Sequence, residues 1–440
     1  MKTLAWMIAL TVVAAMVGCR IGAKYSVGGT LTGLMGRGLV LQDNSGNDLS
    51  LTTNGDFAFT EGIENDGAYS VTVKTQPSDP TQTCTVHNGS GVIDKADVGN
   101  VIVSCTKAGR FAYVANQLSN DLSAYAIASD GALVPIVGSP FPATGTAPAS
   151  LAVDPNGRYL YVVNNASSDM SVFAIDNATG VLTANGLPSP TGSNPYAVAV
   201  DPRDRYLYVT NLASNNVSAF AIDAGTGRLT ELGNSPFAVG AEPTSLKIDA
   251  NDSFLYVTNF KGGNVTVLSI DPASGSLSAI PGSPFGAGAG ALSIALDPAG
   301  TFAYVANETA ATVSEYSIAA SGALSAVSGS PLATGSSPES LAVDPAGRYL
   351  YAANVTAKNH VQQYSIAPSS GALTVSGASV ATGTFPIGLV LDPSGQFAYA
   401  ANDNSGDISA YAVDATTGAL IPVSRSPFAA GSEPRAVAID

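Results

Sequence analysis

The chain has 440 residues, of which 45% are hydrophobic and 12% are charged, with 46 glycines, 26 prolines and a formal net charge of −15. So apolar a chain is not disordered, and so much glycine and proline argues against a long helical protein. The negative charge argues against nucleic acid and acidic membrane surfaces as partners, because both are bound through Lys and Arg. A loop-rich β protein remains.

The first 18 residues have the pattern of an export signal. An apolar run over 4–17 follows a lysine and is shorter than the roughly 20 residues of a membrane-spanning helix. It ends in Met16-Val17-Gly18-Cys19, which resembles the bacterial lipobox, so we predict that Cys19 is lipidated after cleavage. The alternative is a buried or bridged cysteine after an ordinary signal. With lipid, residues 19–24 form a tether and the protein is expected at the outer membrane or cell surface.

Short alternating strands and turn clusters fill residues 25–107. They predict a small β-sandwich. Cys84 and Cys105 are the remaining pair of cysteines in an exported chain, so a disulfide is expected between them. The opening Ser-Val-Gly-Gly-Thr at 26–30 and the Cys84-Thr85-Val86 run resemble an immunoglobulin-like domain of exported bacterial proteins.

One pattern then recurs at an almost constant period to the end of the chain. Its marker is an asparagine that ends an aromatic β run, and successive markers are 47 or 48 residues apart. Repeats of 20 to 50 residues are typical of solenoids and propellers. The seven marker asparagines are Asn116, Asn164, Asn211, Asn259, Asn307, Asn354 and Asn402.

Each repeat is predicted to form four strands, which is one propeller blade. In the second repeat we expect them at 150–154, 158–164, 170–176 and 181–183. Seven repeats over 108–440 therefore predict an all-β, seven-bladed β-propeller after the sandwich.

The two ends of the repeat region are complementary. The region opens on a second strand at 110–113 and stops on a first strand at 436–440. The last strand should therefore complete the first blade and leave no unpaired edge. The aspartates that end the first strands, such as Asp154, precede turns and are expected to cap them and not to bind metal.

The Tyr-Val-Thr-Asn motif at 208–211 and 256–259 resembles the YVTN-repeat propellers of cell-surface proteins. More broadly, residues 109–440 resemble the seven-bladed lactonase-type propellers, which include 6-phosphogluconolactonases and carboxymuconate cyclase relatives. The resemblance implies an Asn-Glu element in the site, which Asn307-Glu308 matches. It also implies a Pro-Arg element, which Pro434-Arg435 matches one blade beyond its expected position.

The chain departs from that family at other site positions. The arginines and the histidine that the resemblance implies fall on apolar or uncharged residues, namely Thr244, Ala291, Val355 and Ile387. Lactone opening needs cations that bind substrate and stabilise developing negative charge. The one histidine of the propeller, His360, is expected in a solvated loop. Whether the protein is an enzyme stays open at this stage.

Two functions are compatible with the sequence: an envelope lipoprotein whose propeller binds a small molecule or a protein, and a lactonase-type hydrolase with a rearranged site. The first is favoured because the cations are missing. Glu308 is the catalytic candidate, with surface charge as the alternative reading, and Arg435 has salt bridging as its alternative. We expect a neutral or cationic ligand on the loop face. The sequence predicts no metal, no cofactor, no nucleic acid and no membrane contact except through lipid. The candidate ligand-binding residues are Glu242, Glu339, Glu433, Arg435 and Asn307.

Overall fold

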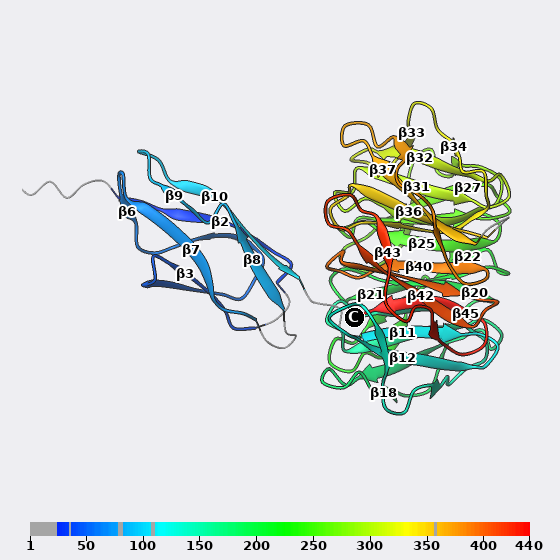
Figure 1. The fold of residues 1–440 in the computed structure, drawn as a ribbon. Helices are drawn as coiled ribbons and strands as arrows, with labels where there is room; N and C mark the ends of the chain where they lie inside the picture. Colours follow the sequence, from blue (N-terminus) through cyan, green and yellow to red (C-terminus); the bar gives the residue numbers. More distant parts are fainter. Residues whose placement is uncertain (1–23, 35–36, 78–81, 107–110, 356–358) are drawn as a thin grey trace, which may run out of the picture. The chain divides into compact units, whose positions relative to one another are not determined.

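The computed structural model describes residues 24–34, 37–77, 82–106, 111–355 and 359–440. The predicted signal sequence and Cys19 lie outside these residues, so their roles stay predictions. Strands and turns make up the described chain, which forms two compact units that divide between Cys105 and Thr106 (Figure 1). A helix able to span a membrane is absent from the described part of the chain.

The first unit contains two four-stranded sheets that share one hydrophobic core. Leu31, Leu41 and Val103 in this core have no exposed surface. A disulfide joins Cys84 to Cys105 on neighbouring strands, as predicted. The immunoglobulin-like character of this unit stays a prediction. In sheet order the strands are β5 (Gly55–Ala58), β2 (Val27–Thr32), β10 (Val98–Thr106) and β8 (Thr83–His87), then β4 (Asn47–Leu51), β3 (Leu39–Asp43), β7 (Ala68–Thr75) and β9 (Ser90–Val92), with β1 (Lys24–Tyr25) paired to β6 (Ile63–Glu64).

The second unit is a propeller of seven antiparallel sheets, as predicted. Its inner strands are β15 (Pro148–Val153), β20 (Pro195–Val200), β25 (Pro243–Ile248), β30 (Ala291–Leu296), β35 (Pro338–Val343), β40 (Pro386–Leu391) and β45 (Pro434–Ile439). Its second strands are β11 (Phe111–Asn116), β16 (Tyr159–Asn164), β21 (Tyr206–Asn211), β26 (Phe254–Asn259), β31 (Phe302–Asn307), β36 (Tyr349–Asn354) and β41 (Phe397–Asn402).

Two further strands complete the four of each blade. The third strands are β12 (Asp121–Ile127), β17 (Asp169–Ile175), β22 (Asn216–Ile222), β27 (Asn264–Ile270), β32 (Thr312–Ile318), β37 (His360–Ile366) and β42 (Asp407–Val413). The fourth strands are β13 (Leu133–Pro135), β18 (Leu182–Ala184), β23 (Leu229–Glu231), β28 (Leu277–Ala279), β33 (Leu324–Ala326), β38 (Leu373–Val375) and β43 (Leu420–Pro422).

Each blade also has a two-residue strand that the sequence analysis missed. It pairs with the start of the third strand, beside the longer fourth strand. These short strands are β14 (Phe141–Pro142), β19 (Ser189–Pro190), β24 (Phe237–Ala238), β29 (Phe285–Gly286), β34 (Leu332–Ala333), β39 (Val380–Ala381) and β44 (Phe428–Ala429).

The second strands are the most deeply buried elements of the propeller. Apolar residues fill both of their faces because each blade packs between two neighbours. One core cluster, for example, joins Tyr161 and Val163 of β16 to Leu207 and Val209 of β21 in the next blade. Burial on both faces explains why these strands are almost continuously apolar instead of alternating.

The ring closes through the last strand. Val437 of β45 pairs antiparallel with Val114 of β11, so the C-terminal strand completes the first blade. The inner strand β45 also contacts both β40 and β15, its neighbours around the channel. The closure predicted from the two ends of the repeat region is therefore confirmed.

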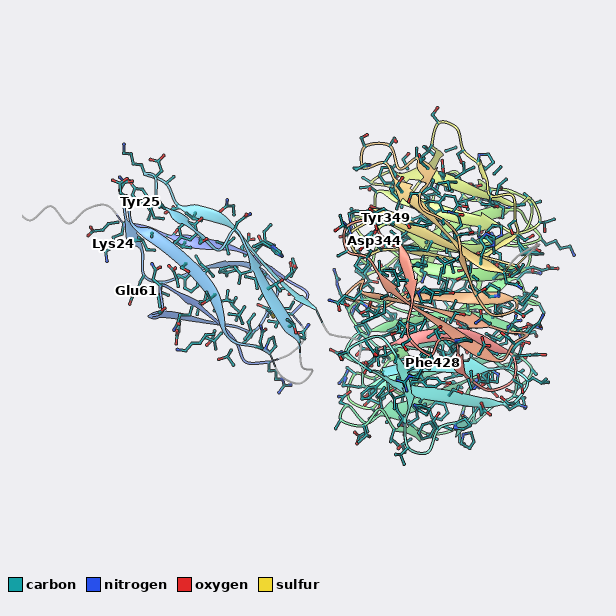
Figure 2. All side chains as sticks on the ribbon, in the orientation of Figure 1. Lys24, Tyr25, Glu61, Asp344, Tyr349 and Phe428 are labelled. Carbon is teal, nitrogen blue, oxygen red and sulfur yellow. A yellow bond between two sulfur atoms is a disulfide. The ribbon has the colours of Figure 1, made fainter. Side chains whose placement is uncertain are left out.

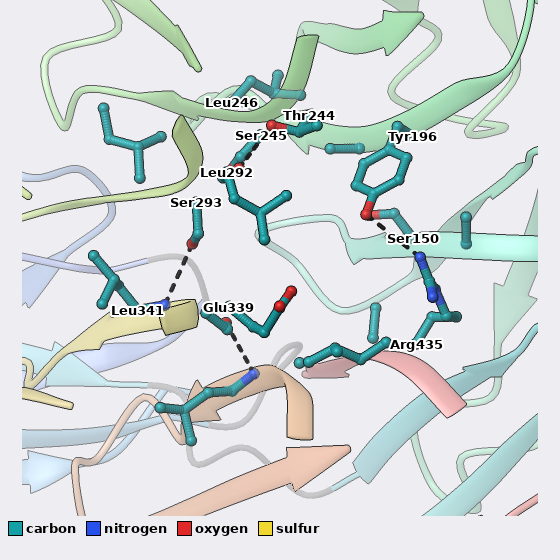
Figure 3. Close-up of a pocket in the computed structure, with 18 of the residues that line it drawn as sticks. Ser150, Tyr196, Thr244, Ser245, Leu246, Leu292, Ser293, Glu339, Leu341 and Arg435 are labelled. Atoms are coloured by element: carbon teal, nitrogen blue, oxygen red, sulfur yellow. Dashed lines mark hydrogen bonds between the residues drawn. The ribbon is translucent and has the colours of Figure 1, made fainter. Parts of the chain in front are cut away.

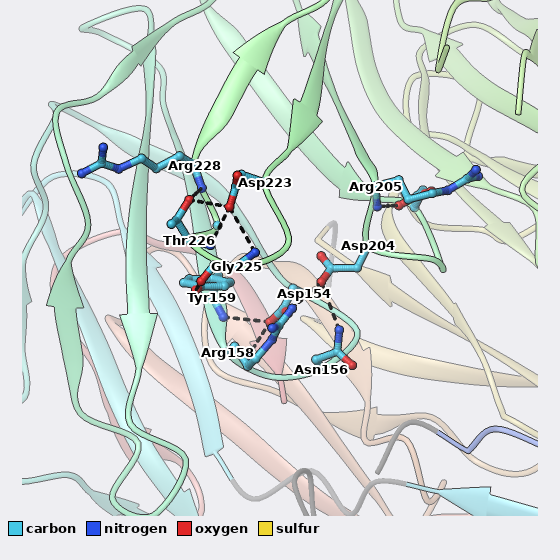
Figure 4. A network of polar contacts seen from close by, with 12 residues as sticks. Asp154, Asn156, Arg158, Tyr159, Asp204, Arg205, Asp223, Gly225, Thr226 and Arg228 are labelled. Carbon is cyan, nitrogen blue, oxygen red and sulfur yellow. Dashed lines mark hydrogen bonds and ion pairs between the residues drawn. The ribbon is translucent and has the colours of Figure 1, made fainter. Parts of the chain in front are cut away.

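The turns between inner and second strands are held by the repeated aspartates. Asp344 Oδ1 accepts the amide of Tyr349 at 2.7 Å (Figure 2), and Asp154 does the same for Tyr159. In two blades an arginine extends the motif across the blade interface. Arg158 Nη2 lies 2.8 Å from Asp204 Oδ2 of the next blade (Figure 4). The predicted turn-capping role of these aspartates is confirmed.

The marker asparagines act at the opposite end of the blades. Asn211 is fully buried, and its Nδ2 donates to Asn216 Oδ1 at 2.8 Å and to Ser218 Oγ at 2.9 Å. Gly192 packs directly against this amide, because a Cβ there would lie 2.6 Å from Asn211 Cγ. The asparagine therefore holds the turn between the second and third strands, and this end carries the loops that lead into the inner strands.

Candidate functional site

Every inner strand carries a β-bulge after its first residue. The pairing register with the second strand shifts there in all seven blades. A bulge leaves one residue unpaired and turns its side chain away from the regular alternation. We call these seven residues the bulge ring: Ala149, Tyr196, Thr244, Leu292, Glu339, Ile387 and Arg435.

A cavity of about 360 Å³ lies at this end of the central channel and is lined by the whole bulge ring. Ser150 and Ser293 add to its wall (Figure 3), as do Ser340 and Phe385. Some of these groups also join blades, since Ser293 Oγ accepts the Leu341 amide of the next blade at 3.3 Å. The cavity therefore combines hydroxyl groups, aromatic rings and ionised side chains.

Arg435 is one of two cations that line this cavity, the other being Lys247. Its Nη2 donates to the Tyr196 hydroxyl at 3.4 Å, and its Nη1 lies 3.7 Å from Asp403 Oδ1. Asp403 lies in the turn between β41 and β42. Burial raises the pKa of the Asp403 carboxyl, Arg435 opposes that shift, and the charge of Glu433 adds to it. The arginine is thus held by the cavity wall while a quarter of its side chain stays exposed.

Glu339 is the titratable acid of the cavity. Burial is the main cause that raises its pKa to about 7, and the neighbouring Glu308 charge raises it further while Arg435 lowers it. A carboxyl with a pKa close to neutrality can accept or release a proton at working pH, which is a property of general bases. Glu339 and Arg435 give this cavity both an acid–base group and a positive charge.

The structure brings some of the predicted site residues together and separates others. Glu339 and Arg435 line the cavity, and Glu308 and Glu433 lie close enough to shift the pKa of its carboxyls. Glu242 forms a surface ion pair instead, with Lys261 Nζ 3.5 Å from its Oε1.

Asn307 is the predicted site residue with the least access to a ligand. It is fully buried, and its Nδ2 donates to Thr312 and Ser314 in its own blade. His360 begins β37 and pairs with Asn354, so the prediction of a loop there is wrong. His360 occupies the same place in its strand as Asn216 in β22, where the first residue of the third strand pairs with the marker asparagine.

Sequence reasoning missed Tyr196, Asp403 and Phe385. The signal was available for Tyr196, because aligning the seven inner strands shows that their second residue differs in every blade. Phe385 lines the cavity with a backbone φ of +64°, a left-handed conformation that bulky residues rarely adopt. The residue before the inner strand has the same left-handed backbone in other blades, as at Ala147 and Glu433, so this conformation belongs to the repeat.

No group of three or more acidic, histidine or cysteine side chains in the described residues is arranged to hold a metal ion. The clustered carboxylates at the other end of the blades are structural. Arg158 and Asp154 pair within one blade, and burial raises the pKa of the partner Asp204. These groups stabilise the interface between two blades.

Comparisons with solved structures agree with this architecture. A putative 6-phosphogluconolactonase from Bacteroides uniformis is 20% identical with a TM-score of 0.67, covering 76% of this chain and 100% of its own. A second one from Bacteroides fragilis is also 20% identical, with a TM-score of 0.65 over 76% of this chain and 99% of its own. A periplasmic gluconolactonase from Pseudomonas aeruginosa is 19% identical, with a TM-score of 0.65 over 75% and 98%. At these identities the likeness shows the fold.

The sequence itself supplies the stronger assignment. Curated proteins gave no match. The family model described as Lactonase, 7-bladed beta-propeller, matches residues 70–193, 188–284 and 279–438, which together span most of the chain. The family match and the seven-bladed fold together show that this protein belongs to the seven-bladed β-propeller lactonase family.

Proposed function

We propose that the protein binds a neutral, hydroxyl-rich small molecule, of the sugar or sugar-lactone kind, in the cavity of the bulge ring. The observation that supports this most is the pairing of Arg435 with Tyr196 and Asp403 beside Glu339. Together with the serine hydroxyls they offer donors and acceptors in one small space. Polyols are recognised by this combination of charged and hydroxyl groups around a mostly pre-formed pocket.

The charge around the cavity favours an uncharged ligand. Four carboxyl groups, those of Glu308, Glu339, Asp403 and Glu433, outnumber the two cations that line the cavity, Arg435 and Lys247. When the carboxyls are ionised, this field repels phosphate and carboxylate groups. A phosphorylated lactone would therefore be a poor ligand, unlike its uncharged counterpart.

The aromatic groups point to the same class. Tyr196 and Phe385 both line the cavity, and flat aromatic surfaces provide apolar contact area with a defined geometry.

Calorimetric titration tests the binding proposal. We expect neutral sugars or sugar lactones to bind and 6-phosphogluconate to bind at least tenfold more weakly. Arg435→Met should weaken the neutral ligand tenfold or more, because it removes a charged donor. The matched control is Arg425→Met, which changes an exposed arginine outside the cavity. Tighter binding of the phosphorylated compound would contradict the proposal.

A second candidate function is hydrolysis of an uncharged lactone, favoured by the pKa of Glu339 near 7. In that reaction the Glu339 carboxylate takes a proton from water, whose oxygen attacks the lactone carbonyl. Arg435 and the Tyr196 hydroxyl stabilise the oxyanion. The ring oxygen then leaves as an alcohol after receiving the proton from Glu339. Glu308, the candidate from the sequence, tunes the base in this scheme.

Turnover of uncharged lactones separates the two candidates. Glu339→Gln should abolish hydrolysis, whereas Glu308→Gln should keep activity and shift its pH profile to lower pH, because one neighbouring negative charge is lost. Absence of turnover with binding intact would leave the binding proposal standing alone.

We propose further that the protein is exported and anchored by lipid on Cys19. The Met16-Val17-Gly18-Cys19 motif supports this, and Arg20 is not the aspartate that retains many lipoproteins at the inner membrane. Cys19→Ala should remove lipid labelling and release the protein from the membrane fraction or leave it unprocessed. Unchanged lipid labelling in this variant would end the proposal.

A further inference from the structure

A single lysine interrupts a second ring of equivalent positions in the channel. Three residues after each bulge residue, six of the seven inner strands carry alanine or valine, and β25 carries Lys247. Small side chains elsewhere in the ring leave room for a long one. The seven residues are Ala152, Ala199, Lys247, Ala295, Ala342, Val390 and Ala438.

Lys247 lies where two cavities of the channel meet. It lines the cavity of the bulge ring and also a second cavity of about 430 Å³ towards the opposite end. No hydrogen bond or ion pair joins its amine to another described residue, although its backbone pairs with Tyr256 of β26. At its own level, the neighbouring strands β20 and β30 present only Ala199 and Ala295.

The channel leaves the amine accessible to small molecules. The Lys247 side chain has exposed surface within the channel, and both cavities border it. Burial lowers the pKa of Lys247, and no neighbouring charge contributes to the shift or opposes it. Desolvation disfavours the ammonium form relative to the neutral amine, and the neutral amine is the nucleophilic form.

We propose that Lys247 is a covalent capture site for small, uncharged aldehydes or ketones that enter the channel. The amine nitrogen attacks the carbonyl carbon and gives a carbinolamine. Loss of one water molecule, formed from the carbonyl oxygen and two hydrogens, then leaves an imine. The step is a reversible condensation, so it needs neither an oxidant nor a reductant.

The charges at both ends of the channel select the class of ligand. Glu339 lines one cavity with Arg435, and Asp297 and Asp392 line the other. An anion approaching from either side meets carboxylates before it reaches the amine. A lysine used to bind anions would also have to stay protonated, whereas burial works against the charged form. An uncharged carbonyl compound meets neither obstacle.

Reductive trapping tests this inference, and its readout is independent of the binding or hydrolysis proposed above. The full chain is incubated with glycolaldehyde and sodium cyanoborohydride at pH 7, and alkylated lysines are mapped by mass spectrometry. The internal control is Lys261, an exposed lysine paired with Glu242 on the same unit. We expect Lys247 to be labelled at least tenfold faster. Equal labelling of the two lysines, or none at Lys247, would overturn the proposal.

Three variants distinguish nucleophilic from merely steric behaviour. Lys247→Met keeps the length of the side chain and should abolish the label, and Lys261→Met should leave labelling of Lys247 unchanged. Lys247→Ala restores the residue found in most of the ring, so it should fold with an unchanged melting temperature. Retention in Lys247→Met of the modification at the same channel peptide would also overturn the assignment.

Discussion

By the frame of the blades we mean the marker asparagines and the aspartates that cap the turns between inner and second strands. The frame and the bulge ring differ in how strictly the seven blades repeat them. At the frame positions almost every blade repeats one solution, such as the Asn211 amide that donates to Asn216 and Ser218. At the bulge ring no two blades carry the same residue, although the backbone does the same thing in all seven. The frame residues therefore serve the same structural role in every blade, whereas the side chains of the bulge ring can vary and determine what the cavity binds.

The largest expected effect comes from opening the closed ring of blades. Deleting residues 436–440 removes most of β45, the partner of β11, and exposes an apolar inner edge. We expect the melting temperature of the propeller to fall by roughly 10 °C or more, measured by calorimetry. A truncated chain that melts like the parent would show that closure contributes little.

A substitution in the bulge ring should instead change how stability depends on pH. The pKa of Glu339 is about 7 in the folded protein, above its ordinary value of 4.5. Between pH 4.5 and about 7 the folded state therefore holds a proton that the unfolded state has released. The contribution of this bound proton to the stability of the fold is lost as the pH rises through about 7. Glu339→Gln should be more stable than the parent by roughly 2–3 kcal/mol at pH 8, with no gap at pH 4.

Chemical denaturation at both pH values measures this difference. Glu231→Gln on the exposed strand β23 is the matched control, because its carboxyl lies outside the cavity. A Glu339→Gln variant whose stability falls with pH as steeply as that of the parent would show that Glu339 is not the group responsible.

Crowding the frame should have a local cost. A Cβ at Gly192 would lie 2.6 Å from Asn211 Cγ, whereas one at Gly233 would meet nothing within 4 Å. We expect Gly192→Ala to destabilise the propeller by about 2 kcal/mol through overpacking, with Gly233→Ala close to the parent. Equal unfolding free energies for the two variants would contradict the close packing of the asparagine.

The smallest expected effect concerns the hydrogen bond from a second-strand tyrosine hydroxyl to the next blade, which one of the blades lacks. Tyr208 Oη donates to the Gly275 carbonyl of the next blade at 2.9 Å, but the Tyr256 hydroxyl is buried without a partner among the described residues. Tyr208→Phe should cost about 1 kcal/mol, and Tyr256→Phe should be neutral or slightly stabilising. Equilibrium unfolding in urea checks both, and the reverse ranking would refute the assignment.

The sequence predicted the frame because repetition amplifies weak local signals. One Tyr-to-Asn strand is ambiguous, but seven at near-constant spacing are not, and the matching of the end strands followed from their order. The two-residue strands such as β19 escaped because Ser189 and Pro190 carry no strand pattern of their own. Their pairing comes from the third strand beside them.

The site was predicted only in part because it depends on the bulge. Glu339 and Arg435 were predicted as ligand-binding residues, but the sequence contains no local sign of the bulge at Arg435 or of its contact with Tyr196. Asp403 lies in a different loop, and only the ring geometry brings it within 3.7 Å of Arg435. Contacts of this kind join residues that are far apart in sequence and repeat in no other blade.

Because of the bulge, substitutions that change the cavity wall are separate from substitutions that disturb the strand pairing. A new side chain at position 244 or 292 alters one wall of the cavity, while the strand pairing that holds the blade involves its neighbours and not the bulged residue itself. Each of the seven positions of the bulge ring can therefore be substituted without a change at the other six. A lineage of these propellers can therefore exchange one ligand for another by single substitutions, with little loss of stability at any step.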